Sequence, residues 1–415
     1  KSDILTAYNL PYPDVNPDIA LGNSKLRPWV KDLETKATQF TVKIDSSSNG
    51  NGSGVIIAKS GKVYTVLTAD HVICEKPEGA ISSTPCINYS YKITTHDGKI
   101  YSLNKNTFIR QEGVDLAVFQ FESDDNYPVA QIADYGTNEA DYVFVAGFPK
   151  VGNENPKWMF NGGFISNLFQ TRQSDFNKSE SGSLSRASSS LTGGYELVYT
   201  SITYGGMSGG AVLDSQGRLI GIHGRSEGVK GYIQLGFSLG IPINTFLGLK
   251  DKFKINPQIL TNSPQLNNSQ KKDLYNVIVN VEVPKTNAKA DIWIERGNQL
   301  WRLSKYDEAI KAFEEAIKQN DPNYVYLGWY GKGLALFYLK KDEESIKAFD
   351  QAIITLPKGE DLQEFHGSIL YWQSALYRFL EDYEKGLMTI NKAIAISPNN
   401  PNLYNEKWSI LYRTL

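Results

Sequence analysis

The chain has 415 residues, of which 41% are hydrophobic, 12% aromatic and 21% charged. This composition is typical of a folded protein with two or three domains, because one core rarely extends over so long a chain. Lysine and arginine number 43 against 45 acidic residues, which excludes the basic excess of a nucleic-acid binder. The longest apolar runs, such as residues 63–69, are far shorter than the ~20 residues that span a membrane. We therefore expect no nucleic-acid partner and no membrane span.

The chain begins Lys1-Ser2-Asp3, without a methionine. Either an export signal has been removed or the sequence has been trimmed, and the residues do not separate these two explanations. Under the first explanation the protein is extracytoplasmic, that is, periplasmic or secreted. Residues 1–35 are rich in Pro, Asn and Asp and show no sustained period. They predict an irregular N-terminal extension.

Residues 36–249 carry the pattern of an all-β domain. Short β-branched or alternating runs are separated by turn signals such as Asn-Gly and Asp-Gly, without helical stretches between them, which predicts a sandwich or a pair of barrels. The serine-rich segment 174–190 predicts a long loop. The clearest expected strands are residues 40–44, 54–58, 64–68, 115–121, 142–146, 196–200 and 218–222.

A linker is expected at 250–287, with one candidate strand at 277–283, and the period then becomes helical. Trp293, Gly297, Ala309, Phe313 and Ala316 recur 36 residues later as Trp329, Gly333, Ser345, Phe349 and Ala352. A weaker third copy follows, and residues 402–415 predict a capping helix. This spacing resembles the tetratricopeptide repeat, in which small residues let two antiparallel helices approach closely. The resemblance implies an all-α domain over residues 288–415, with three repeats and a cap.

The two cysteines, Cys74 and Cys86, enclose a loop that contains Pro and Gly. They would form a loop-closing disulfide in an exported protein and two separate thiols in a cytosolic one. We favour the disulfide because no third cysteine is left over.

Four glycines surround Ser208 in the stretch TYGGMSGGAV, residues 203–212. A serine hydroxyl becomes a nucleophile only with a base in hydrogen-bonding reach and a third group that orients the base. Of the four histidines, His96 lies in a predicted turn and His366 in the third repeat. His71 and His223 each end an apolar run, so they are the candidates for chemistry.

Three segments in this order, Leu67-Thr68-Ala69-Asp70-His71, Val114-Asp115-Leu116-Ala117-Val118 and Gly205-Gly206-Met207-Ser208-Gly209-Gly210, resemble the catalytic segments of chymotrypsin-fold serine peptidases. The resemblance covers residues 36–249 and implies an all-β double barrel. It implies that Ser208 attacks the scissile carbonyl, His71 transfers the proton, and Asp115 orients the imidazole. The backbone N–H groups of Gly206 and Ser208 would stabilise the oxyanion. The resemblance implies no metal ion and no cofactor.

Two positions depart from the digestive branch of this family. Met207 occupies the place of an aspartate that pairs with a newly released amino terminus, so that maturation switch is expected to be absent. Gly224 occupies the place of a serine that supports the catalytic aspartate, which leaves open what supports Asp115.

Thr203 and His223 are similar to the pair with which bacterial glutamyl endopeptidases bind an acidic side chain. A hydroxyl and an imidazole N–H both donate to a carboxylate, and Arg225 either adds positive charge or faces solvent. Ile202 offers no acidic group, which argues against cleavage after Lys or Arg. We therefore expect preference for an acidic residue at P1, the position before the cleaved bond. The competing interpretation is that His223 ends a strand and has only a structural role.

The sequence as a whole favours a serine endopeptidase acting on protein or peptide substrates, with repeats that recruit a substrate or partner. Two alternatives are a quality-control peptidase similar to the Deg type, cleaving after small apolar residues, and an inactive scaffold whose repeats carry the function. The repeat groove is expected to bind a protein partner, with packing between helices as the competing role for its side chains. The expected groove residues are Asn298, Trp301, Arg302, Tyr330, Leu334, Phe337, Tyr338, Tyr371 and Arg378.

Overall fold

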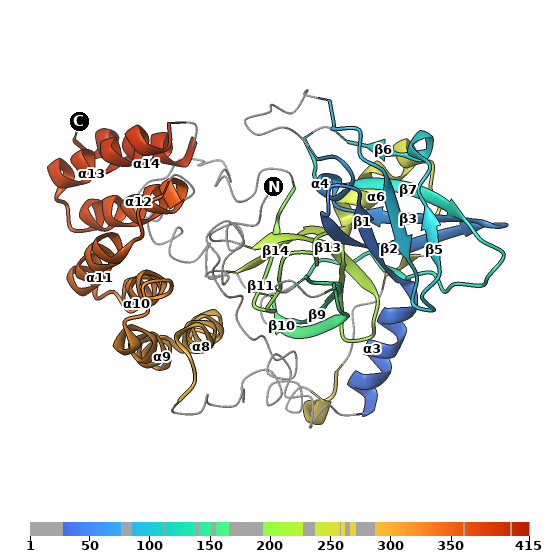
Figure 1. Ribbon diagram of the computed structural model, residues 1–415, viewed down its shortest axis with the longest axis horizontal. Helices are drawn as coiled ribbons and strands as arrows, with labels where there is room; N and C mark the ends of the chain where they lie inside the picture. The colour runs from blue at the N-terminus through green and yellow to red at the C-terminus, as the bar shows by residue number, and fades with distance from the viewer. Residues whose placement is uncertain are drawn as a thin grey trace. The chain divides into compact units, whose positions relative to one another are not determined.

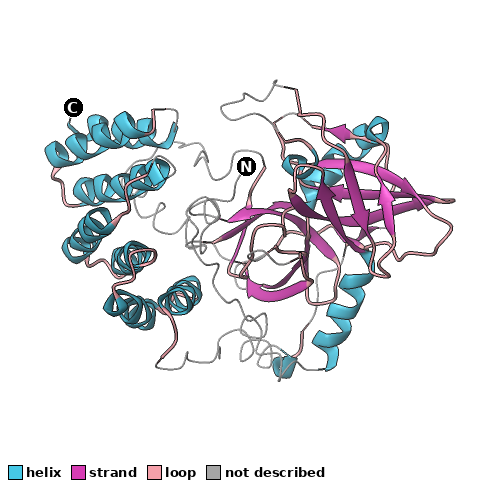
Figure 2. Cartoon of the chain, in the orientation of Figure 1, coloured by secondary structure: helices cyan, strands magenta, loops and turns pink. Residues whose placement is uncertain are grey.

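The protein consists of two compact units, a β-rich unit within residues 28–270 and a helical unit within residues 287–414. Figure 1 traces both in the computed structural model, and Figure 2 shows the contrast in secondary structure between them. The structure describes residues 28–75, 85–111, 113–137, 141–150, 155–165, 194–226, 237–257, 259–261, 266–270, 287–359, 362–398 and 401–414.

The first sheet of the β-rich unit has the strand order β5-β4-β1-β2-β3-β7-β6 and curls into a half-barrel. Each pair of neighbouring strands is antiparallel. Its strands are β1 (Thr41–Ser46), β2 (Asn51–Ser60), β3 (Val63–Thr68), β4 (Tyr91–Thr94), β5 (Ile100–Ser102), β6 (Ile109–Arg110) and β7 (Ala117–Glu122), with the short helices α4 (Asp70–Ile73) and η2 (Lys105–Thr107) between them.

The second sheet forms the other half-barrel, with the order β10-β9-β12-β13-β14-β11. Two short strands extend it in parallel pairing, β8 against β13 and β15 against β8. The elements are β8 (Ile132–Ala133), β9 (Tyr142–Gly147), β10 (Met159–Phe164), β11 (Leu197–Tyr199), β12 (Ala211–Leu213), β13 (Leu219–Ser226), β14 (Ser238–Pro242), helix α6 (Ile243–Phe253) and β15 (Ile259–Leu260). The expected all-β double barrel is therefore confirmed.

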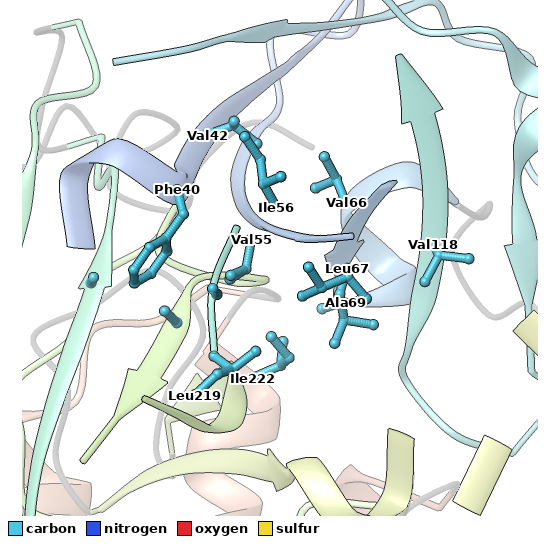
Figure 3. Packing of buried hydrophobic residues seen from close by; sticks show 14 of the residues in the cluster. Phe40, Val42, Val55, Ile56, Val66, Leu67, Ala69, Val118, Leu219 and Ile222 are labelled. Carbon is cyan, nitrogen blue, oxygen red and sulfur yellow. The ribbon is translucent and has the colours of Figure 1, made fainter. Parts of the chain in front are cut away.

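One hydrophobic core joins the two barrels. Val55 and Leu67 of the first sheet share it with Leu219 and Ile222 of the second, and all four are almost completely buried. Figure 3 shows these side chains together. Because this shared core fixes one sheet against the other, side chains from both sheets can build a single site.

Helix α3 (Pro28–Phe40) contradicts part of the expected irregular extension at residues 1–35. Val30, Leu33, Ala37 and Phe40 lie on one face of it and are buried in the core. Their three- and four-residue spacing is the signal of an amphipathic helix, and the proline and asparagine content of the preceding residues concealed it. Residues 1–27 lie outside the described part of the chain.

The expected linker at 250–287 begins too early, because α6 continues to Phe253 and β15 pairs with β8. Phe253 stacks on Phe246 and is buried in the core, so the apolar contacts keep this segment in the β-rich unit. The expected strand at 277–283 and the expected loop at 174–190 lie outside the described residues.

The helical unit consists of antiparallel helix pairs. The recurring spacing of small and aromatic residues therefore predicted its all-α fold class correctly. Its described helices are α8 (Ala290–Arg302), α9 (Tyr306–Gln319), α10 (Val325–Tyr338), α11 (Asp342–Thr355), α12 (Gln363–Phe379), α13 (Tyr383–Ile396) and α14 (Pro401–Thr414). None of the described helices is both long and apolar enough to cross a membrane.

The recurring glycine and phenylalanine form a close contact inside each of the first two pairs, α8 with α9 and α10 with α11. A Cβ at Gly333 would lie 2.7 Å from the ring of Phe349, and one at Gly297 would lie 2.5 Å from the ring of Phe313. Only a residue without a side chain lets α10 approach α11 this closely. Trp301 and Tyr338, two of the expected groove residues, also pack against each other with ring centroids 5.3 Å apart, which favours the packing role for this pair.

Replacing Phe349 by alanine should lower the free energy of unfolding of the helical unit by about 3–5 kcal/mol. The ring is completely buried, and its loss leaves a cavity between α10 and α11. Denaturant unfolding monitored by circular dichroism measures the change. Ile354→Ala on the same helix is the matched control, because Ile354 is 70% exposed and its truncation should change the free energy by less than ~0.5 kcal/mol. Equal effects of both substitutions would contradict this packing.

Candidate active site

His71 and Asp115 meet at the end of the first barrel. His71 lies in α4, directly after β3, and Asp115 directly precedes β7, which pairs with β3. The Nδ1 atom of His71 lies 2.7 Å from Oδ2 of Asp115, and the His71 backbone N–H donates to Oδ1 at 2.9 Å. The carboxylate therefore fixes both the ring and the backbone of His71, as the proposed orienting role requires.

An ion pair anchors the helix turn that carries His71. Arg110 on β6 donates from Nε and, at 2.7 Å, from a terminal nitrogen to the carboxylate of Asp70. The Asp70 backbone N–H also donates to the Asp115 carbonyl at 3.2 Å. Asp70, the residue before His71, is thus tied both to β6 and to the segment that precedes β7.

Two opposing effects act on the pKa of His71. Partial desolvation by the surrounding groups lowers the pKa of His71, whose side chain is still 48% exposed, but the Asp115 carboxylate and its hydrogen bond raise it more strongly, so the pKa lies above the ordinary 6.5. For Asp115, burial raises the pKa, but the positive charge and hydrogen bonds of His71 lower it by more. The pKa therefore lies below its ordinary value, and the carboxyl group is ionised near neutral pH.

In the catalytic role that the sequence predicts for His71, the imidazole must accept a proton, which its imidazolium form cannot do. The acid limb of kcat/KM should then have its midpoint above pH 6.5, with activity lost as the pH falls through the raised pKa of His71. A pH profile of the hydrolysis of a peptide substrate measures the midpoint. A midpoint below pH 6.5 would contradict the inference that Asp115 raises the pKa of His71 by more than desolvation lowers it.

Ser208 lies in the turn before β12 of the second barrel. Its hydroxyl donates to the Gly224 carbonyl at 2.8 Å, and no hydrogen bond joins it to His71 among the described residues. The structure therefore brings His71 and Asp115 into direct contact and shows Ser208 bonded to β13 instead.

Ser53 on β2 holds the loop around Ser208, a role that the sequence did not reveal. Its backbone N–H donates to the Ser208 carbonyl at 2.8 Å, and its hydroxyl donates to the Gly206 carbonyl at 2.9 Å. Ser53 is completely buried. The alternation of small residues in Gly52-Ser53-Gly54 was the available signal, since such a run permits close backbone approach.

The backbone N–H groups of Gly206 and Ser208 donate to no group within the described part of the chain. Gly206 has a φ of +98°, a conformation that favours glycine. The Gly205 carbonyl accepts from the Lys150 N–H at 2.9 Å, and this directs the Gly206 N–H away from Lys150 across the trans peptide. The two N–H groups remain available for an oxyanion.

Thr203 and His223 lie in one buried polar cluster of the second barrel. Thr203 Oγ1 lies 2.9 Å from Ser238 Oγ, and His223 Nδ1 lies 2.5 Å from the Tyr199 hydroxyl. Ser238 and Tyr199 are directly paired between β14 and β11. Both predicted pocket residues are thus joined through this strand pair, and both side chains are buried.

Arg225 follows on the same strand, and its guanidinium lies 4.6 Å from the ring centroid of Tyr195. The backbone of His223 also bonds to the two glycines that follow Ser208. Its carbonyl accepts from Gly209 at 2.7 Å and its N–H donates to Gly210 at 2.9 Å. The strand that carries the predicted pocket residues therefore holds the segment that follows Ser208.

The remaining predicted positions have these places. Cys74 and Cys86 form a disulfide, with Cα atoms 5.0 Å apart, just beyond α4. Met207 is completely buried among apolar residues of the second barrel. His96 packs edge-on against Tyr127, and burial lowers the pKa of His366 in α12. No group of three or more His, Cys, Asp or Glu side chains suited to a metal occurs within the described residues.

The fold and these contacts define a class: a chymotrypsin-like double barrel with a histidine–aspartate pair on one barrel and a serine in a glycine-rich turn on the other. Comparison with protein families agrees. Residues 52–222 match the trypsin-like peptidase domain, and residues 294–360 and 367–400 match the tetratricopeptide repeat. The chain therefore contains a trypsin-like peptidase domain followed by tetratricopeptide repeats. A search of curated proteins found no match.

Solved structures with a similar fold include an HtrA-type protease, AlgW with tripeptide, and a serine endoprotease from Yersinia pestis. The first is 20% identical with a TM-score of 0.39, over 55% of this chain and 63% of that chain. The second is 21% identical with a TM-score of 0.36, over 55% of this chain and 67% of that chain. A variant of AlgW with tripeptide matches with 19% identity and a TM-score of 0.40, over 55% of this chain and 63% of that chain.

Proposed function

We propose that this protein is a serine endopeptidase in which Ser208 is the nucleophile, His71 the general base and acid, and Asp115 the residue that orients His71. The observation that carries the proposal is the paired contact of Asp115 with the ring and the backbone of His71. Such a contact holds the imidazole in the tautomer whose Nε2 can accept a proton from a serine.

In this mechanism Ser208 exchanges its hydrogen bond to the Gly224 carbonyl for one to His71, and its oxygen attacks the scissile carbonyl. The negative charge that develops is stabilised by the N–H groups of Gly206 and Ser208. His71 then returns the proton to the leaving amine, and water completes the hydrolysis by the same route. The buried hydrogen bonds of Ser53 support the proposal, because they hold the loop carbonyls away from the oxyanion.

An acidic P1 preference belongs to the same proposal. The contact between His223 and Tyr199 supports it, because it fixes the imidazole of His223 in the buried polar cluster that also contains Thr203, and an imidazole N–H is a suitable donor to a carboxylate. Thr203 lies in the same polar cluster and can supply a hydroxyl donor. Arg225 adds positive charge close by. A pocket of this kind stabilises glutamate or aspartate better than an apolar side chain.

The repeats, in this proposal, bind a protein substrate or partner, since stacked helix pairs present extended surfaces suited to such ligands. The disulfide between Cys74 and Cys86 supports an extracytoplasmic location, periplasmic or secreted, because disulfides persist mainly in oxidising compartments. The proposed domain boundaries follow the two units, with the peptidase domain beginning at α3 and ending after β15.

Covalent labelling tests the catalytic part of the proposal. A fluorophosphonate probe should label the full-length protein once, and mass spectrometry should place the label on Ser208. Ser208→Ala should abolish the labelling, whereas Ser215→Ala, which changes another buried serine of the same barrel, should not. An unlabelled, folded wild-type protein would instead favour an interaction scaffold.

Substitution of His223 by alanine should lower kcat/KM for cleavage after glutamate about 10- to 100-fold, because a charge-assisted hydrogen bond is lost. Labelling of Ser208 should persist in this variant. Profiling of wild type and variant with a peptide library measures the preference. Efficient cleavage by the wild type after small apolar residues would instead favour a Deg-type specificity.

A further inference from the structure

The carboxylate of Asp115 has a third partner besides the two groups of His71. The hydroxyl of Tyr195 donates to Oδ2, the same oxygen that contacts His71 Nδ1. Tyr195 lies 80 residues from Asp115 along the chain and just before β11 of the second barrel. The bond therefore connects the aspartate of the first barrel to the second barrel.

Gly224 provides the space that the tyrosine occupies. A Cβ at Gly224 would overlap the Tyr195 ring, with Cζ only 2.5 Å away. A serine at this position, as in the digestive enzymes, could not coexist with the ring as it lies here. The absence of a side chain at Gly224 and the presence of Tyr195 are thus two parts of one arrangement.

The surroundings of Tyr195 keep its hydroxyl a donor. The side chain is 3% exposed, and Arg225 lies over its ring. Burial, followed by the nearby Asp115 carboxylate, raises the pKa of the phenol far above its ordinary value of 10.0. The hydroxyl is therefore protonated near neutral pH and can donate to the carboxylate of Asp115.

We propose that Tyr195 is a positioning residue for Asp115, and that it fills the supporting role left open by Gly224. The proposal rests on the proposed peptidase function, since the orientation of Asp115 affects turnover only through His71. It deepens that function by adding a hydrogen bond from the second barrel to the triad.

The position of the hydroxyl also predicts its electrostatic effect. Its positive end faces Oδ2 beside the imidazole, so it weakens the attraction between the carboxylate and protonated His71. The other charged groups that act on His71 are Asp70, which Arg110 neutralises in part, and Arg225. None of them is changed when only the Tyr195 hydroxyl is removed.

Tyr195→Phe, which keeps the ring, is the direct test. We expect kcat to fall about tenfold with little change in KM, as is typical when an outer hydrogen-bond partner is lost, and we expect the acid limb of kcat/KM to move to higher pH. The matched control is Tyr135→Phe, which removes a tyrosine hydroxyl from a different carboxylate, that of Asp214. Unchanged kcat and an unchanged limb in Tyr195→Phe would overturn the proposal.

A measurement without turnover separates this proposal from the peptidase function. In a Ser208→Ala background, NMR titration of the imidazole of His71 should show a higher midpoint when Tyr195→Phe is added. With four histidines in the chain, a His71→Gln variant assigns the resonance. If the wild-type protein does not react with the fluorophosphonate probe, the proposed peptidase function is wrong. The titration still tests the contact between Tyr195 and Asp115 in that case. An unchanged midpoint overturns the positioning role even in an active enzyme.

A second pair of variants tests the shared space. Tyr195→Ala should lose more activity than Tyr195→Phe, and adding Gly224→Ser should recover at least threefold, because the new hydroxyl can then reach Asp115. Gly224→Ser alone should be at least as damaging as Tyr195→Ala, since the ring is still present. If the double variant Tyr195→Ala, Gly224→Ser is no more active than Tyr195→Ala, the serine hydroxyl does not replace the tyrosine hydroxyl as the partner of Asp115.

Discussion

Replacing Asp115 by asparagine should lower kcat about ten-thousandfold, the loss seen when a triad aspartate is changed to its amide. The amide would present an N–H to Nδ1 of His71 in place of the oxygen that now lies 2.7 Å away. The imidazole would then carry its proton on Nε2, where it cannot accept one from Ser208. Steady-state hydrolysis of a peptide substrate, corrected by active-site labelling, measures the loss.

Asp125→Asn is the matched control for Asp115→Asn. Asp125 is also bonded by a tyrosine hydroxyl, that of Tyr101, and by Lys99, but at the surface of the same barrel. Its variant should keep activity within about twofold. A residual activity of Asp115→Asn within tenfold of wild type would contradict the assignment of the orienting role.

Gly206→Ala should lower kcat about 100- to 1,000-fold, the effect of losing one oxyanion donor. The φ of Gly206 is +98°, and a Cβ there would lie 2.7 Å from the Phe148 carbonyl. The loop must shift to relieve this overlap, and the Gly206 N–H shifts with it. Turnover per labelled site gives kcat, and thermal unfolding checks that the variant is folded.

The neighbouring glycine supplies the control for Gly206→Ala. A Cβ at Gly205 would meet no atom within 4 Å, and Gly205→Ala keeps the carbonyl that Lys150 binds. Its activity should stay within a few-fold of wild type. If both substitutions had equal effects, the geometry of the Gly206 peptide would not be the cause.

The sequence predicted the parts of the site that depend on short contiguous segments. His71 closes an apolar strand, Asp115 opens one, and Ser208 lies in a glycine-rich turn, so each has a local signal. Their order resembled that of a known family, which implied the double barrel, whereas the strand pattern alone left a sandwich and a pair of barrels open. The repeats were indicated by the residues that recur 36 positions apart. The catalytic roles remain predictions, as does the P1 preference.

Contacts between distant segments could not be predicted in the same way. Ser53, 153 residues before Gly206, holds the loop of Ser208. The glycines beside Ser53 indicate a close backbone approach, but they do not identify the approaching segment. For Tyr195 the only sequence signal was Gly224, whose missing side chain left the support of Asp115 open. It did not indicate which residue supplies that support. Helix α3 was missed because Pro and Asn residues next to it obscured its period.

The two backbone hydrogen bonds between His223 and residues 209–210 bear on any redesign of the proposed acidic selectivity. In the proposed peptidase, substrate choice and the placement of Ser208 depend on one stretch of main chain. Changes confined to side chains, at Thr203 or Tyr199 for example, leave that stretch in place. Insertions or proline in β13 would disturb both properties at once, so a library for altered selectivity should leave that backbone untouched.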